Sequence, residues 1–85
     1  MKKGTLVQIQ DNKTIAILVE DVAMNSHTAT ALYMTREHPL PRIIQLSIRN
    51  GLYYFSYDNS RFLEEGQYEE ELVQLKRMVM YTNVK

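Results

Sequence analysis

Apolar and polar residues alternate along the chain on both sides of Asn50-Gly51, over residues 43–57. Asn-Gly is the pair preferred in two-residue type I′ turns, because both central positions need a positive φ. The cross-strand pairs expected from this turn are Ile48 with Tyr53, Leu46 with Phe55, and Ile44 with Tyr57. All six side chains share one face, so the pattern predicts a β-hairpin whose aromatic residues belong mainly to the core.

A second hairpin is predicted nearer the start of the chain, between residues 5–10 and 14–22. The cluster Asp11-Asn12-Lys13 supplies the turn, and both flanks are rich in β-forming residues. We expect a three-residue loop, because it gathers apolar side chains on one face. The pairs that it predicts are Ile9 with Ile15, Val7 with Ile17, and Thr5 with Val19. One loop residue must then be left-handed, which Asn12 tolerates better than Lys13.

Residues 25–38 carry conflicting signals. Asn25 and Ser26 are good helix caps, and apolar positions that follow them at helical spacing favour a short helix. The β-branched threonines at positions 28, 30 and 35 favour a strand instead. We predict the helix and keep the strand as the alternative. The prolines at positions 39 and 41 end either element.

The last part of the chain predicts a helix from about Gln67 to Met80. Its apolar stripe, spaced by four, three and four residues, consists of Tyr68, Leu72, Leu75 and Val79. Glutamates at 69–71 and basic residues at 76–77 suit the helix dipole. Phe62 is out of phase with the stripe, so a break is expected at Gly66. The β-prone residues 78–84 could add a strand instead.

Together these elements predict a single small α+β domain over residues 1–85. Two antiparallel β-hairpins form a small, mostly antiparallel sheet that could close into a barrel, with a C-terminal helix and a short middle helix. The first hairpin resembles the opening of small SH3-like barrels, a resemblance of shape that implies no function.

Charge and composition narrow the function classes. Ten basic and ten acidic side chains cancel, which disfavours a general nucleic-acid binder, since phosphate contacts require a basic surface. The absence of cysteine excludes disulfides and thiolate metal sites. Gly4 interrupts any apolar segment after Lys2-Lys3, and no apolar run is long enough to span a bilayer. We therefore expect a cytoplasmic protein without membrane contact.

The sequence contains no recognisable catalytic pattern. His27 and His38 are the only histidines, and their spacing matches no metal-ligand motif. There is no Gly-x-Ser-x-Gly elbow and no phosphate-binding loop. The adjacent acids Glu20-Asp21 point to opposite sides of an extended chain. We expect neither enzymatic activity nor a cofactor nor a metal.

Two surfaces remain as candidates for partner binding. On the outer face of the second hairpin lie Gln45, Arg49, Leu52 and Tyr54. Met78 and Met80 lie off the helix stripe, and methionines are common on adaptable binding surfaces. A domain this small gains stability from association. The sequence thus favours a non-enzymatic protein-binding or regulatory module, with a protein partner or as a homodimer.

Two alternatives stay open. The first is a weak binder of single-stranded nucleic acid, in which an aromatic ring stacks on bases and arginines contact phosphates. The residues assigned to that role are Arg42, Arg49, Tyr54 and Arg61. The second is a protein that holds a small ligand between helix and sheet.

Overall fold

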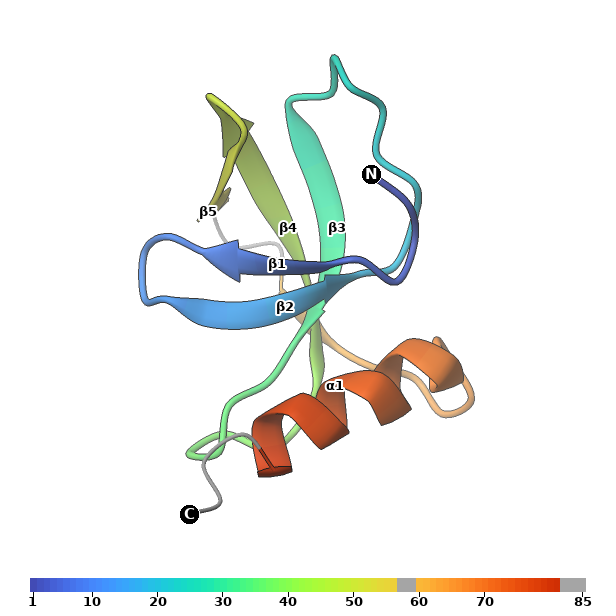
Figure 1. Ribbon diagram of the computed structural model, residues 1–85. Helices are drawn as coiled ribbons and strands as arrows, with labels where there is room; N and C mark the ends of the chain where they lie inside the picture. Colours follow the sequence, from blue (N-terminus) through green and yellow to red (C-terminus); the bar gives the residue numbers. More distant parts are fainter. Residues whose placement is uncertain (57–59, 82–85) are drawn as a thin grey trace.

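A computed structural model shows a strongly curved sheet that closes into a barrel, with a helix lying along one side (Figure 1). The structure describes residues 1–56 and 60–81. The strands are β1 (Leu6–Ile9), β2 (Thr14–Leu18), β3 (Thr28–Tyr33), β4 (Arg42–Arg49), β5 (Leu52–Phe55) and β6 (Arg61–Phe62), and the helix is α1 (Glu69–Tyr81). The predicted α+β class and the C-terminal helix are therefore confirmed.

Strands β1 to β5 form a closed meander. Each pairs antiparallel with the next, and β5 returns to β1 in a parallel pair, while β6 adds to the edge of β4. Every second side chain points into the barrel, as the pleat requires. The buried interior residues are Val7, Ile9, Ala16, Leu18, Val22, Ala29, Ala31, Ile44, Leu46 and Tyr53. Small alanines on β2 and β3 leave room for the larger side chains opposite them.

A second apolar layer lies outside the barrel, where α1 packs on β2 and β3. Its fully buried centre is Leu75, which contacts a sheet face formed by Ile17, Val19, Leu32, Met34 and Ile43. The other members of the predicted stripe, Tyr68, Leu72 and Val79, are half-buried at its margins. The stripe therefore covers the sheet, as its period predicts.

The turn at Asn50-Gly51 has the predicted conformation, with φ of 53° and 77°. Ile48 pairs with Tyr53 and Leu46 with Phe55, the predicted register. Phe55 does not belong to the core, however. It is 36% exposed at the end of the barrel, where its ring meets Tyr33 edge to face at 5.5 Å. The prediction for Tyr57 lies outside the described residues.

The register predicted for the first hairpin is wrong by one residue. Ile9 pairs with Thr14 and Val7 with Ala16, across a four-residue connection. Lys13, not Asn12, takes the left-handed conformation (φ 63°), and its N–H donates to the Ile9 carbonyl oxygen at 2.8 Å. The Asn12 side chain accepts a hydrogen bond from the Thr14 N–H instead. Because β2 is apolar on both faces, its sequence does not show which face points into the barrel, so it could not fix the register of the pair.

The middle helix is also wrong, since residues 28–33 form β3. This strand pairs with β2 on one side and with β4 on the other, so it completes the barrel. Ala29 and Ala31 are small because they point into a narrow interior, which outweighs their helix propensity. Asn25 and Ser26 lie in the loop before the strand and cap no helix.

The segment before α1 contains one element that periodicity does not predict. Two residues, Arg61 and Phe62, form β6 opposite Ile43 and Arg42. The expected break at Gly66 is present, with φ of 82°, and α1 begins at Glu69. The alternative strand over 78–84 is wrong for residues 78–81, which are helical, and its remainder lies outside the described residues.

The start of the chain ties the helix to the barrel. The Met1 ammonium donates to the Val22 carbonyl oxygen at 2.9 Å, and the Val22 N–H donates back to Met1 at 2.7 Å. The Lys3 ammonium lies 3.7 Å from the carboxylate of Glu71, whose side chain faces the sheet and is only 6% exposed as a residue. A buried carboxylate needs such a partner. Among the described residues, no helix is both long and apolar enough to cross a membrane.

The parallel contact between β1 and β5 is short. Ile9 pairs with Tyr53, and the Gln10 N–H donates to the Tyr53 carbonyl oxygen at 2.8 Å. The side chain of Asp11 then accepts a hydrogen bond from the Phe55 N–H at 3.0 Å. A loop carboxylate therefore takes the place of a further backbone acceptor where β1 ends.

Replacement of Asp11 tests this contact. We expect Asp11→Ala to lower the free energy of unfolding by about 1 kcal/mol, because the Phe55 N–H loses its acceptor. Asp11→Asn should cost less, since an amide oxygen can still accept. Urea unfolding gives the energies, and hydrogen exchange at the Phe55 amide gives the local effect. Equal exchange rates in Asp11→Ala and the unmodified chain would contradict the assignment.

Substitutions at two of the left-handed turn positions, Gly51 and Lys13, are expected to have opposite effects on stability. Gly51→Ala should destabilise the chain by about 1 kcal/mol, since a Cβ is strained at positive φ even where space is open. Lys13→Gly should be neutral or stabilising, because the lysine already bears that strain. Urea midpoints compare the two variants directly. A stability loss of the same size in both would show that the turn conformation is not the cause.

Candidate functional site

The structure brings the predicted hairpin residues together on the outer face of β4 and β5. Tyr54 pairs with Ser47, and Leu52 pairs with Arg49. Leu52 is exposed at the turn, and Gln45 is half-buried nearer the middle of β4. The outer face is therefore a mixed polar surface with one exposed leucine at its tip.

The aromatic ring on this face is already in contact. The guanidinium carbon of Arg49 lies 4.0 Å from the centroid of the Tyr54 ring, a cation–π contact. A base could stack on this side of the ring only by displacing Arg49. This contact weakens the case for nucleic-acid binding through Tyr54.

The other residues assigned to nucleic acid do not extend this surface as a group. Arg61 pairs with Ile43 and shares the outer face. Arg42 belongs to the opposite side of β4, where its guanidinium carbon lies 5.5 Å from the centroid of the Phe62 ring. The structure thus separates Arg42 from the other three residues of that alternative.

The predicted methionine surface lies on a different part of the molecule. Met78 is half-buried on α1 and borders a hollow of about 290 Å³ between the helix and the β1–β2 hairpin. The hairpin of β4 and β5 lies at the other end of the barrel (Figure 1). The prediction for the Met80 side chain lies outside what the structure describes.

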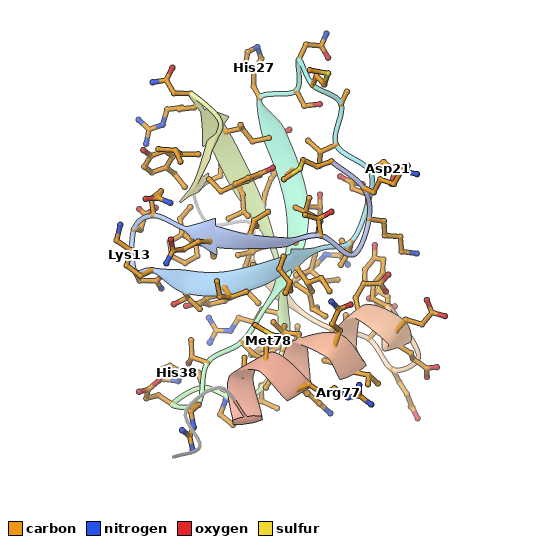
Figure 2. The ribbon with its side chains drawn as sticks, viewed as in Figure 1. Lys13, Asp21, His27, His38, Arg77 and Met78 are labelled. Atoms are coloured by element: carbon orange, nitrogen blue, oxygen red, sulfur yellow. The ribbon has the colours of Figure 1, made fainter. Side chains whose placement is uncertain are left out.

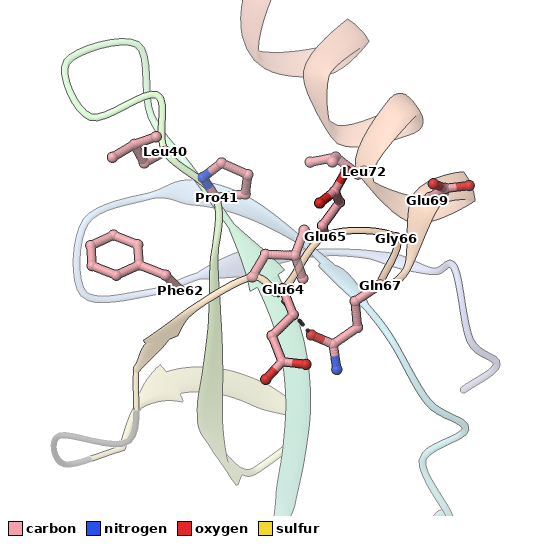
Figure 3. Close-up of a pocket in the computed structure, with 10 residues that line it drawn as sticks. Leu40, Pro41, Phe62, Glu64, Glu65, Gly66, Gln67, Glu69 and Leu72 are labelled. Carbon is pink, nitrogen blue, oxygen red and sulfur yellow. Dashed lines mark hydrogen bonds between the residues drawn. The ribbon is translucent and has the colours of Figure 1, made fainter.

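A larger apolar groove lies between the β3–β4 loop, β6 and the start of α1, with a volume of about 430 Å³. One side is formed by Leu40, Pro41 and Phe62 (Figure 3). Leu40 is 66% exposed and Phe62 is 61% exposed. Leu63 and Leu72 complete the apolar lining and join it to the layer under α1. We call this surface the Leu40–Phe62 groove.

The other side of the Leu40–Phe62 groove is acidic. Glu64, Glu65 and Glu69 line it, all three are exposed, and no basic residue is among the described residues that line the groove. Figure 3 shows Glu65 and Glu69 beside Leu72 near the start of α1, whereas the carboxylate of Glu64 points away from Leu40. Leu40, Pro41 and Phe62 thus form one side of the groove, and the glutamates lie on the other side together with Leu72.

Hydrogen bonds fix the turn that forms the acidic side. The Gln67 N–H donates to the Glu64 carbonyl oxygen at 3.2 Å, and the Glu64 N–H donates to the Gln67 side-chain oxygen at 3.3 Å. After Gly66, Tyr68 also has a positive φ of 53°, and its carbonyl oxygen accepts the Leu72 N–H as the helix begins. A tyrosine in this conformation is strained, and such strain often occurs at binding sites.

Sequence reasoning did not identify the residues of this groove. Leu40 stands between two prolines, and Phe62 is out of phase with the helix stripe. Both are large apolar residues that fit no periodic pattern. This lack of fit was the sign in the sequence that they could belong to a surface site. Leu40 and Phe62 line the same groove because β6 pairs with β4. A strand of two residues is too short to be predicted from the sequence.

The histidines form no common site. Figure 2 shows His27 and His38 at opposite ends of the molecule. Within residues 1–56 and 60–81, no group of three or more histidine or acidic side chains is placed to hold a metal ion. The Leu40–Phe62 groove therefore remains the site with the most distinct chemistry.

No protein-family model, no curated protein and no solved structure matches this chain. The function must therefore be inferred from the surface itself.

The contact between Arg49 and Tyr54 predicts the behaviour of the outer face towards nucleic acid. Retention of a labelled single-stranded oligonucleotide at low salt should be weak and equal for the unmodified chain and an Arg49→Ala, Tyr54→Ala double variant. Filter binding over a series of salt concentrations measures this. Tight binding that falls steeply with salt and is lost in the double variant would support the nucleic-acid alternative instead.

Proposed function

We propose that this chain is a non-enzymatic protein-binding module and that the Leu40–Phe62 groove is its contact surface. The observation that carries the proposal is the exposure of Leu40 and Phe62 beside one apolar groove. Single exposed apolar residues are common, but a continuous apolar surface rimmed by polar groups is typical of an interaction site.

The shape of the groove favours a protein segment over an enclosed small molecule. Its volume of about 430 Å³ is within the range of ligand pockets. Such pockets, however, bury most of the ligand surface, whereas Leu40 and Phe62 are largely exposed at the margin. A segment that lies across the groove would cover both side chains.

The chemistry of the lining supports binding rather than catalysis. Its titratable groups are the carboxylates of Glu64, Glu65 and Glu69. No histidine, serine, threonine or lysine is among the described lining residues, so these carboxylates have no nucleophile beside them. We propose that occupancy of the groove has a regulatory role and that the contact is made in the cytoplasm, as expected from the sequence.

A substitution at Phe62 tests the proposal. Phe62→Ser removes an exposed apolar group and should leave the fold intact, while partner capture falls at least about tenfold, as expected for loss of a large interface anchor. Val73→Ser is the matched control, because Val73 is 54% exposed on α1 and is not a lining residue of the groove. Quantitative affinity capture from the native cell provides the comparison.

The outcomes of that experiment are distinct. Proteins captured by the unmodified chain and by Val73→Ser, but lost with Phe62→Ser, support the proposal. Equal capture by all three forms would contradict it. Light scattering on the same proteins detects self-association, and a dimer that Phe62→Ser dissociates would make the partner a second copy of the chain.

A further inference from the structure

The Leu40–Phe62 groove has two sides with different chemistry, and together they restrict what can occupy it. On one side, Leu40 and Phe62 offer apolar surface that is largely exposed to water. Burial of these side chains is favourable only against apolar groups. The occupant must therefore carry apolar side chains that enter the groove between Phe62 and Leu72.

The acidic side restricts the charge of the occupant. The exposed residues Glu64, Glu65 and Glu69 are all lining residues of this groove. Glu69 also lies in the first turn of α1, where the helix dipole favours it. Glu64 and Glu65 precede the helix and have no such structural role. An acidic segment would be repelled here, and a basic one would be attracted.

Other charged residues lie near the groove, but none of the described lining residues is basic. Two arginines adjoin the apolar side: the Arg42 guanidinium contacts the Phe62 ring, and the exposed Arg61 precedes Phe62 in β6. Glu71 faces the sheet near Lys3 and so adds no free charge to the rim. The chain as a whole has zero net charge, so the acidic side is a local feature and not a consequence of composition.

The acidic side is also held in position before any partner arrives. The two hydrogen bonds between Glu64 and Gln67 close the turn, and the Leu63 N–H donates to the Pro41 carbonyl oxygen at 3.4 Å. This last bond links the two sides of the groove through the backbone. Binding therefore need not order the turn, which lowers its entropic cost.

We propose that the Leu40–Phe62 groove binds a basic amphipathic segment of another protein, with apolar side chains in the groove and lysines or arginines opposite Glu64 and Glu65. This inference rests on the proposed function and specifies the class of partner. Apolar anchors provide the affinity, and the carboxylates select against neutral and acidic segments.

Three synthetic peptides test the charge preference. The first is an amphipathic peptide with leucines at helical spacing and lysines between them. The second has glutamate in place of each lysine, and the third keeps the lysines but has serine in place of each leucine. Isothermal titration at low salt should detect binding of the first peptide alone.

Two double variants locate the interaction. Glu64→Gln with Glu65→Gln should weaken binding of the first peptide about 3- to 10-fold, the range for loss of two exposed ion pairs, and the loss should shrink as salt increases. Glu20→Gln with Glu37→Gln is the matched control. These two glutamates are exposed and are not lining residues of the groove, so their replacement removes the same charge and should change nothing.

The results separate this inference from the proposed function. Equal binding of the lysine and glutamate peptides, or an unchanged affinity in Glu64→Gln with Glu65→Gln, would overturn the charge preference while Phe62→Ser still abolished partner capture. Failure of all three peptides to bind would also overturn it. Equal partner capture by Phe62→Ser would overturn the proposed function itself. A dimer that the Phe62 substitution dissociates would assign the groove to a second copy instead.

Discussion

The closure of a five-strand meander is the constraint on which the rest of the structure depends. Each strand runs opposite to its predecessor, so the first and fifth strands run in the same direction and can close the barrel only as a parallel pair. That pair is short, with Ile9 opposite Tyr53 and one backbone hydrogen bond from Gln10. Asp11 provides a further acceptor. Both paired side chains are buried, so closure and burial of the interior depend on each other.

Closure also explains why β2 is apolar on both faces. Inside the barrel, Ala16 and Leu18 of β2 meet the other strands, while Ile17 on the same strand lies under α1. The helix therefore covers a face that the barrel alone would leave in water. Glu71 lies on the covered side of α1, and its contact with Lys3 joins the helix to the segment before β1. Replacement of Lys3 would leave this buried carboxylate without that cation.

The sequence predicted those elements for which two independent signals agreed. At Asn50-Gly51, turn chemistry and alternation specified the same register, and the structure has it. Around Lys13 the second signal was missing, because β2 has no polar face to fix the pairing. In β3, small residues required by the narrow interior resembled helix formers. Local propensity could not reveal either effect, since both arise from the closed barrel.

The Leu40–Phe62 groove could not be predicted from the sequence, for a related reason. Its residues come from a loop, a two-residue strand and a helix start, and none of these has enough length for a periodic signal. The hairpin surface, in contrast, follows from alternation, and its residues Arg49, Leu52 and Tyr54 do share one face.

The short parallel contact between β1 and β5 has a consequence for folding. The four antiparallel pairs of the meander join strands that are neighbours in sequence, whereas Ile9 and Tyr53 are far apart along the chain. Contacts between distant residues bear the largest loop-closure entropy, so this contact forms late. Until it forms, β1 and β5 are open strand edges that can pair with the same edges of another nascent chain. An open β1 or β5 edge is therefore a place where strands of two copies can exchange, and the hydrogen bond from the Phe55 N–H to Asp11 lies beside the edges that closure covers.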